Sequence, residues 1–371
     1  MSRWPAALDA SAVFSKSKLT TTTQARRSFA AELVSHLKQY GFARVRNHGV
    51  TPVAIKGLFK YHRDFFALPL SSKLTVRHPG GESPARGYSP WAYEKTAVLR
   101  PDLHSPTDPA RDSLGAHSTR NETGHFSSKM LLDAREQFAV GPPSDVAYPT
   151  PRLAEAILPG FDQATRSAHA EISQTCRALV DAIEEGLGAP RDSISGPTEG
   201  GRGAELNLNF YPEVERDALE NSATSDSCDE SVAMRRIWPH SDLGVISALF
   251  QDGVGASGLE LQWRGPLENE FAPVAIEQEG DLVLLVSDTL ERWTNGQLRA
   301  AVHRVGTPPV SPTGSSGAHH VPERRSAVMF FRAPPTADLG PLPCFVSKAD
   351  PAKYEHVTAG EYLKRHNKRL Y

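Results

Sequence analysis

The second half of the chain consists of short apolar runs separated by Gly and Pro, and this pattern limits the possible folds more than any other feature. Many short strands with such turns favour a closed or double-sheet β architecture. No internal repeat is visible in the sequence. The strands that we expect are residues 206–211, 237–250, 259–263, 281–286, 303–305 and 326–331.

The first half of the chain has helical periodicity instead. Residues 24–40 and 51–66 have apolar side chains at helical spacing, and the longest such stretch is 161–187, directly followed by Gly188. A glycine after the last periodic residue is a helix stop signal. The polar and acidic residues 217–231 predict a loop. We therefore expect a mainly β protein with flanking helices.

Two histidines and one aspartate can meet in the β region. His240 and Asp242 are two residues apart in an expected strand, so their side chains point to the same side and can bind one ion together. His303 comes from another expected strand, so the group depends on the fold. Two imidazoles and a carboxylate hold non-haem Fe(II) on one face, and the opposite face stays open for an organic ligand and O2.

A second group of residues suits a carboxylate ligand. Arg324 and Ser326 are also two residues apart, at the start of an apolar strand. A guanidinium and a hydroxyl on one face can bind a carboxylate together. Upstream, strict alternation puts Asn207, Asn209 and Tyr211 on one face of their strand. We expect this polar stripe to bind a polar ligand inside the barrel.

Several segments, in order along the chain, resemble the Fe(II)/2-oxoglutarate-dependent dioxygenases of the isopenicillin N synthase-like family. There are two departures from the family pattern: Ser287 replaces the usual Gly, and the stretch between His303 and Arg324 is longer. The segments that carry the resemblance are GFARVRNHGV at 41–50, RGYSPWAYEK at 86–95, DAREQFAVG at 133–141, NFYP at 209–212, and DTLERWTNG at 288–296 followed by HRV at 303–305.

The resemblance implies a fold and a set of roles. The fold is a double-stranded β-helix, or jelly roll, braced by helices. The implied Fe(II) ligands are His240, Asp242 and His303, and the implied 2-oxoglutarate-binding residues are Arg324, Ser326, Tyr211 and Asn209. On this basis the chain is one compact unit with a helix-rich amino-terminal region at 1–200, a jelly-roll core with both sites at 201–335, and a carboxy-terminal helical segment at 336–371.

The reaction that the resemblance implies consumes O2 and 2-oxoglutarate and oxidises a C–H bond of a small organic metabolite. The outcome is hydroxylation, desaturation or ring formation, with release of succinate and CO2. Analogy with the family favours a substrate from secondary metabolism. One alternative is an iron and O2 oxidase that does not use 2-oxoglutarate, in which Arg324 and Ser326 hold a substrate carboxylate. Another alternative is a catalytically silent binding protein of the same fold.

The substrate pocket is less well defined by the sequence. The aromatic candidates for its wall are Phe250, Phe331, Trp91 and Tyr93. Residues 101–128 and 306–322 are polar and interrupted by Pro, which indicates loops. Each loop is either a surface loop or a lid over the substrate, because long loops in compact domains often cover active sites.

Composition argues against several kinds of partner. The net charge of −2 gives no basic surface for nucleic acid, and no apolar run approaches the length of a membrane span. The three cysteines are widely spaced and odd in number, which is typical of reduced thiols in a cytoplasmic protein. We expect a small-molecule substrate as the partner. The oligomeric state does not follow from the sequence.

Overall fold

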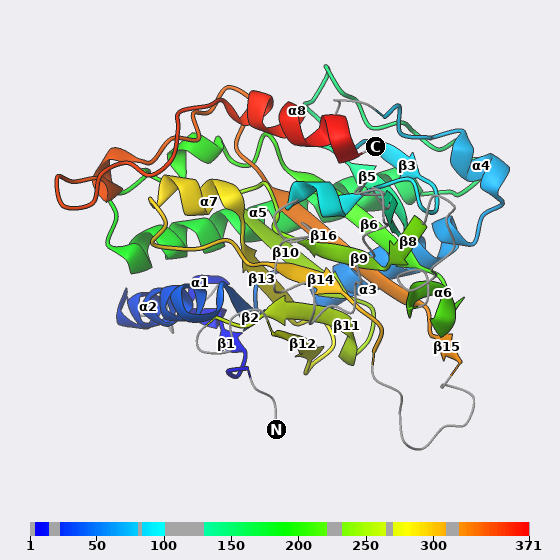
Figure 1. The fold of residues 1–371 in the computed structure, drawn as a ribbon, viewed down its shortest axis with the longest axis horizontal. Coiled ribbons are helices and arrows are strands. Elements are labelled where there is room, and N and C mark those ends of the chain that lie inside the picture. The colour runs from blue at the N-terminus through cyan, green and yellow to red at the C-terminus, as the bar shows by residue number, and fades with distance from the viewer. Residues whose placement is uncertain are drawn as a thin grey trace, which may run out of the picture.

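Two β-sheets form the core of the molecule. The computed structural model describes residues 4–14, 23–80, 84–100, 130–220, 232–264, 270–308 and 319–370. The main sheet has the strand order β1 (Leu8–Asp9), β2 (Phe42–Arg46), β13 (Leu282–Val286), β10 (Ile246–Gln251), β16 (Arg324–Phe331), β6 (Glu205–Tyr211), β5 (Glu136–Val140) and β3 (Gly87–Ser89). The second sheet has the order β12 (Phe271–Ile276), β11 (Gly255–Gln262), β14 (His303–Val305) and β9 (Ile237–His240) (Figure 1).

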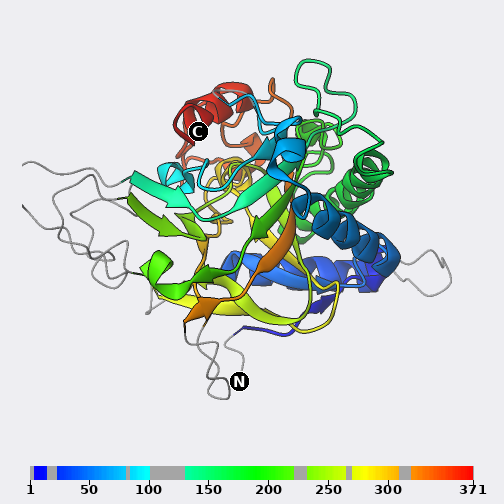
Figure 2. The same cartoon turned by 90° about the vertical axis from the view of Figure 1, so that its right-hand side faces the viewer.

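Three long helices cover one side of the main sheet. They are α2 (Thr23–Tyr40), α3 (Pro52–Phe66) and α5 (Phe161–Leu187), drawn in blue and green in Figure 2. Their apolar faces and the facing strand residues form one large core, whose members include Leu33, Leu37, Ile172, Leu179, Phe250 and Phe331. The helices therefore leave the opposite face of the main sheet to the second sheet, and the predicted helix-braced jelly roll is confirmed.

The remaining elements are short, apart from the last helix. The helices are α1 (Ser11–Phe14), α4 (Leu70–Leu74), α6 (Arg216–Glu220), α7 (Asp288–Trp293) and α8 (Ala359–Leu370), with 3-10 turns at Thr96–Leu99, Gly196–Thr198 and Pro343–Phe345. Two further strand pairs are β7 (Val214–Glu215) with β15 (His320–Val321), and β4 (Met130–Asp133) with β8 (Val232–Arg235). No helix in the described part of the chain is both long and apolar enough to span a membrane.

The strand expected at 237–250 is wrong as a single element. β9 ends at His240 and β10 begins at Ile246, and the two strands belong to different sheets. Leu243 and Val245 in the connection are buried, so the sequence stays apolar where the chain changes sheets. Gly244 fits there because a Cβ would lie 2.9 Å from the carbonyl oxygen of Phe331.

Two of the expected loops are only partly described. The first four residues of the expected loop 217–231 belong to α6, and residues 221–231 lie outside the described part. In the loop 306–322, His320–Val321 forms β15, while residues 309–318 lie outside it. Residues 101–128 lie wholly outside it. For residues 101–128 and 306–322, the choice between a lid and a surface loop therefore stays open.

Candidate metal and co-substrate site

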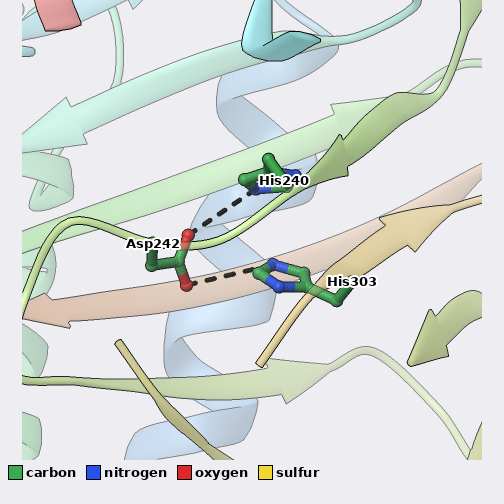
Figure 3. Close-up of side chains that lie close together, drawn as sticks. All are labelled: His240, Asp242 and His303. Atoms are coloured by element: carbon green, nitrogen blue, oxygen red, sulfur yellow. Dashed lines mark ion pairs between the residues drawn. The ribbon is translucent and has the colours of Figure 1, made fainter. Parts of the chain in front are cut away.

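His240, Asp242 and His303 meet between the two sheets. His240 is the last residue of β9, and the antiparallel register pairs it directly with His303 of β14. Asp242 follows two residues later, beyond the end of the strand rather than within it as the sequence suggested. Its Oδ1 lies 3.6 Å from Nε2 of His240 and its Oδ2 lies 3.9 Å from Nε2 of His303 (Figure 3). The three potential ligand atoms all lie within 4.8 Å of one another.

Backbone carbonyls fix both imidazole rings. Nδ1 of His240 donates to the carbonyl oxygen of Trp238 at 2.8 Å, and Nδ1 of His303 donates to that of Ala301 at 3.0 Å. A carbonyl can only accept, so the proton of each neutral ring sits on Nδ1. The Nε2 lone pairs are then directed at Asp242 and are available to a metal, which is the usual orientation of metal-bound histidine.

Burial and neighbouring charge set the protonation of His303 and Asp242. Burial lowers the pKa of His303 to about 4, and the neighbouring His240 contributes in the same direction. His303 is therefore neutral near pH 7, which is the form that binds a metal. Burial alone would raise the pKa of Asp242, but the facing imidazoles of His303 and His240 outweigh it and keep this pKa well below its usual range.

The donor set fits a divalent cation. Oδ2 of Asp242 is buried and accepts no hydrogen bond from any described residue. A buried carboxylate oxygen without a donor is costly unless a cation completes its environment. Two neutral imidazoles and one carboxylate on one side of an ion are the ligands of non-haem Fe(II) sites with open positions. The residues present therefore fit the metal that the sequence predicts.

Arg324 and Ser326 form a second polar group beside the metal triad. In Arg324, Nη1 donates to the hydroxyl of Ser326 at 2.9 Å and Nε donates to that of Ser257 at 3.0 Å. Its guanidinium lies 4.9 Å from the ring centroid of Tyr211. Its Nη2 is buried without a hydrogen-bond partner, and within the described ranges no carboxylate pairs with it. A buried cation of this kind is suited to an anionic ligand.

An open cavity extends from the triad along the main sheet, and its empty space, including solvent outside the mouth, is about 780 Å³. Asn209 and Tyr211 line it, whereas Arg324 and Ser326 lie beside it. Further lining residues come from β5, β6, β16 and the end of α8, including Gln137, Glu205, Asn207, Phe330, Asn367 and Leu370. The cavity therefore brings the polar stripe of β6 to the metal triad, as the sequence predicts.

The four aromatic residues expected in the pocket wall do not line this cavity. Phe250 and Phe331 point to the other face of the main sheet, where they are buried in the core under the helices. Trp91 is 37% exposed, and the ring of Tyr93 lies 5.2 Å from the guanidinium of Arg77. Proximity in sequence to the ligand strands does not determine which face a side chain occupies, because neighbouring strand residues alternate between faces.

The sequence interpretation missed part of the cavity wall. Glu94, Arg135 and Gln137 lie in matched segments, but no strand was expected there. β5 reads EQFAV, two polar residues followed by three apolar ones, so the sequence has no alternation there that would indicate a strand. Asn367 and Leu370 join the wall only through the packing of α8, for which the sequence carries no local signal.

Two family models match the chain. The model described as the 2OG-Fe(II) oxygenase superfamily matches residues 205–334, which include the triad and Arg324. The model described as the non-haem dioxygenase in morphine synthesis N-terminal region matches residues 12–154. Together the two models cover most of the elements around the cavity.

Curated relatives and solved structures agree with these models. The 2-oxoglutarate-dependent dioxygenase imqE of Aspergillus flavus is 36% identical over 94% of this chain and 91% of its own length. The 2-oxoglutarate-dependent dioxygenase phqC of Penicillium fellutanum is 35% identical over 93% and 89%. A full-length Neurospora crassa protein in complex with alpha-KG has the same fold, with a TM-score of 0.74 at 23% identity over 97% of this chain and 94% of its own. The chain belongs to the 2OG-Fe(II) oxygenase superfamily and is an Fe(II)/2-oxoglutarate-dependent dioxygenase.

Proposed function

We propose that His240, Asp242 and His303 hold the catalytic Fe(II), and that Arg324, Ser326, Tyr211 and Asn209 bind 2-oxoglutarate. The observation that carries the proposal is the pair of incomplete buried groups. Within the described ranges, Oδ2 of Asp242 accepts no hydrogen bond beside two Nε2 lone pairs, and the guanidinium of Arg324 has no anionic partner. A cation at the first group and the far carboxylate of 2-oxoglutarate at the second would complete both.

Each residue then has a physical task. Bound Fe(II) and 2-oxoglutarate supply the oxidising chemistry, in which O2 is consumed and succinate and CO2 are released. The carbonyls of Trp238 and Ala301 hold the imidazoles in the metal-binding tautomer. Arg324 and Ser326 orient the co-substrate by charge-assisted hydrogen bonds. The cavity wall positions the substrate C–H bond and excludes water.

The substrate that we propose is a small organic metabolite, oxidised at a C–H bond. The cavity is lined by apolar side chains with polar groups among them, which is typical of small-molecule sites. Relatives named as 2-oxoglutarate-dependent dioxygenases, such as those of Aspergillus flavus and Penicillium fellutanum, support a role in secondary metabolism.

We also propose that the protein works in the cytoplasm. Among the described residues, Cys176 is buried and Cys344 is exposed, and both are free thiols. Free thiols are typical of reducing compartments. Cell fractionation followed by immunodetection tests this proposal, and recovery of the protein in an organelle or in the medium would contradict it.

The iron-ligand assignment is tested by replacing Asp242. We expect Asp242→Ala to bind less than about a tenth of the iron of the wild type and to form no succinate above the metal-free background, because two neutral imidazoles alone bind Fe(II) weakly. Asp252→Ala is the matched control, since Asp252 pairs with Arg63 at 2.6 Å near the surface. Iron content by mass spectrometry and succinate by chromatography are the two measurements. Full iron binding by Asp242→Ala would refute the assignment.

A further inference from the structure

The far half of the cavity contains an amide side chain that forms no hydrogen bond with any residue that the structure describes. Asn207 lies on β6 on the same face as Asn209 and Tyr211, and it lines the cavity while only 4% exposed. Its Oδ1 is buried and accepts no hydrogen bond, and its Nδ2 donates none to another described residue. Nearly all buried polar groups are paired, so an unpaired amide facing a cavity indicates a ligand that pairs with it.

A second acceptor lies next to Asn207 on the neighbouring strand. β5 and β6 pair Gln137 with Asn209 and Ala139 with Asn207, so Gln137 is the diagonal neighbour of Asn207 on the cavity face. Nε2 of Gln137 donates to Oε1 of Glu94 at 2.7 Å, which fixes the orientation of the amide. Its Oε1 is then left buried without a donor from the described part of the chain. Two adjacent carbonyl oxygens therefore need hydrogen-bond donors from the ligand.

The charged residues of the same wall compensate one another. Arg135 pairs with Glu94. Glu205 accepts from Arg332 at 3.1 Å and from Arg86, behind the wall, at 2.8 Å. A ligand that brought its own charge to this half of the cavity would compete with these buried pairs and would lose hydration without a dedicated counter-ion. The wall therefore favours a polar ligand without net charge.

The position of Asn207 relative to the co-substrate residues allows a ligand to bind beside 2-oxoglutarate. Asn207 is four residues before Tyr211 on one strand, which is roughly 13 Å at the usual rise of about 3.3 Å per residue. The metal triad lines the same cavity. A small ligand held at Asn207 thus shares the cavity with the metal triad and leaves the co-substrate residues Arg324 and Ser326 free.

We propose that Asn207, supported by Gln137, recognises the substrate through a cyclic amide group, that is, a lactam. A primary amide with both atoms free presents one donor and one acceptor side by side. A lactam presents the complementary N–H and C=O on one edge, so the two groups form paired hydrogen bonds. The lactam N–H pairs with the acceptor of Asn207, and a second donor of the ligand is needed for that of Gln137, whereas a carboxylate has no donor for either acceptor. The proposal rests on the proposed function, since it names the substrate class of that site.

The test uses two probe molecules that differ only in their N–H groups. Cyclic diglycine has two lactam edges, and cyclic disarcosine is the same ring with both nitrogens methylated. Binding of each to the full-length chain is followed by ligand-observed NMR with 2-oxoglutarate and with diamagnetic Zn(II) in place of Fe(II). We expect saturable binding of cyclic diglycine and at least tenfold weaker binding of cyclic disarcosine.

Variants identify the residue that discriminates. Asn207→Leu keeps the branched shape of the side chain without its polar atoms. It is expected to lose at least tenfold in affinity for cyclic diglycine, while its affinity for 2-oxoglutarate stays within about twofold of the wild type. Ser89→Ala is the matched control and is expected to bind like the wild type. Ser89 Oγ is likewise buried without a hydrogen-bond partner among the described residues, but it does not line the cavity.

Three outcomes would overturn the proposal: no saturable binding of cyclic diglycine, equal binding of both probes, or unchanged binding in Asn207→Leu. If Asn207→Leu fails to fold, the comparison of the two probes on the wild type still decides. Failure of the proposed function gives a different result. The wild-type protein would then not bind 2-oxoglutarate, independently of how the two cyclic probes bind.

Discussion

At the scale of single residues, the site consists of buried polar groups for which the described residues supply no hydrogen-bond donor or counter-ion. Arg324 is 3% exposed, and burial lowers its pKa, although an arginine remains charged under all ordinary conditions. The two serine hydroxyls that it contacts carry no charge. Its positive charge is therefore available to a bound anion, and we expect its removal to affect the co-substrate far more than the metal.

The first prediction concerns Arg324→Leu. Each charge-assisted hydrogen bond lost is worth about 1.5–3 kcal/mol, so the affinity for 2-oxoglutarate should fall roughly ten- to a hundredfold or more. The iron content should stay near that of the wild type, because none of the triad atoms contacts Arg324. Anaerobic calorimetry with 2-oxoglutarate and metal analysis measure the two quantities.

Arg325→Leu is the matched control for this prediction. Arg325 is the next residue on β16, and it pairs with Glu323 at 2.6 Å on the opposite face of the strand. We expect it to keep the wild-type affinity for 2-oxoglutarate. Equal loss in both variants would show that the effect comes from the strand and not from the Arg324 guanidinium.

Which of these residues the sequence could predict depends on how local the signal is. Arg324 with Ser326, and Asn207 with Asn209 and Tyr211, follow from alternation along one strand. Contacts between residues on different strands cannot be predicted from this alternation. The diagonal position of Gln137 next to Asn207 depends on the register of β5 and β6, which no single segment encodes. The roles proposed for the metal triad in binding iron, and for Arg324, Ser326, Tyr211 and Asn209 in binding 2-oxoglutarate, stay predictions.

At the scale of elements, long periodic segments were predictable and short ones were not. The helix expected at 161–187 is confirmed as α5 at Phe161–Leu187, because the apolar stripe and Gly188 mark both its face and its end. Strands such as β3 and β12 were not predicted, because they are short or irregular. The pairing of β11 with β12, for example, shifts register between Ala256 and Glu260. Such strands are stabilised by their neighbours rather than by their own sequence.

The packing of α2 against α5 gives a second prediction, at Gly186. A Cβ at this position would lie 2.2 Å from the carbonyl oxygen of Ala30 and 2.7 Å from Cγ2 of Val34. We expect Gly186→Ala to lower the free energy of unfolding by about 1–3 kcal/mol through overpacking, which outweighs the gain in helix propensity. Urea unfolding followed by circular dichroism measures the change.

Gly57 in α3 provides the matched control. A Cβ there meets no atom within 4 Å. Gly57→Ala should raise the free energy of unfolding by about 0.5–1 kcal/mol, since alanine loses less backbone entropy in a helix. If the two substitutions changed stability in the same direction, the close approach of α2 and α5 at Gly186 would be in doubt.

At the scale of the whole molecule, the helices and the site are connected through one buried histidine. His62 of α3 is fully buried, and its Nε2 donates to the carbonyl oxygen of Asn209 at 2.9 Å. The side chain of Asn209 in turn accepts from Arg135 at 2.9 Å in the cavity wall. Four strands of the main sheet come from before residue 200, namely β1, β2, β3 and β5. The division of the chain at residues 200 and 335 stays a prediction.

His62 leads to a prediction about pH. Burial lowers its pKa to about 3, whereas an unfolded histidine has a pKa of about 6.5. Between pH 3 and pH 6.5, roughly, His62 is therefore protonated in the unfolded chain and neutral in the folded chain. The free energy of unfolding falls as the pH falls through this range. The loss should approach 1.4 kcal/mol per pH unit from this residue. Above about pH 6.5 it contributes no pH dependence.

This pH effect can be isolated with His62→Gln, which keeps a side-chain donor but does not titrate. Urea unfolding at about pH 7.5 and at about pH 5 gives the stability difference for each protein. We expect this difference to be about 2 kcal/mol smaller in His62→Gln than in the wild type. Identical pH dependence in both proteins would mean that the pKa of His62 is the same in the folded and unfolded states, which would contradict the lowered pKa.

The central claim is that one buried site binds Fe(II) and 2-oxoglutarate together, and an anaerobic titration tests it most directly. Fe(II) is added first and 2-oxoglutarate second, while the visible spectrum and the bound iron are recorded. The account predicts a weak metal-to-ligand charge-transfer band that needs both additions, and that Arg324→Leu shows only at much higher 2-oxoglutarate. Bound iron without any such band in the wild type would contradict the account and would favour an iron and O2 oxidase that does not use 2-oxoglutarate.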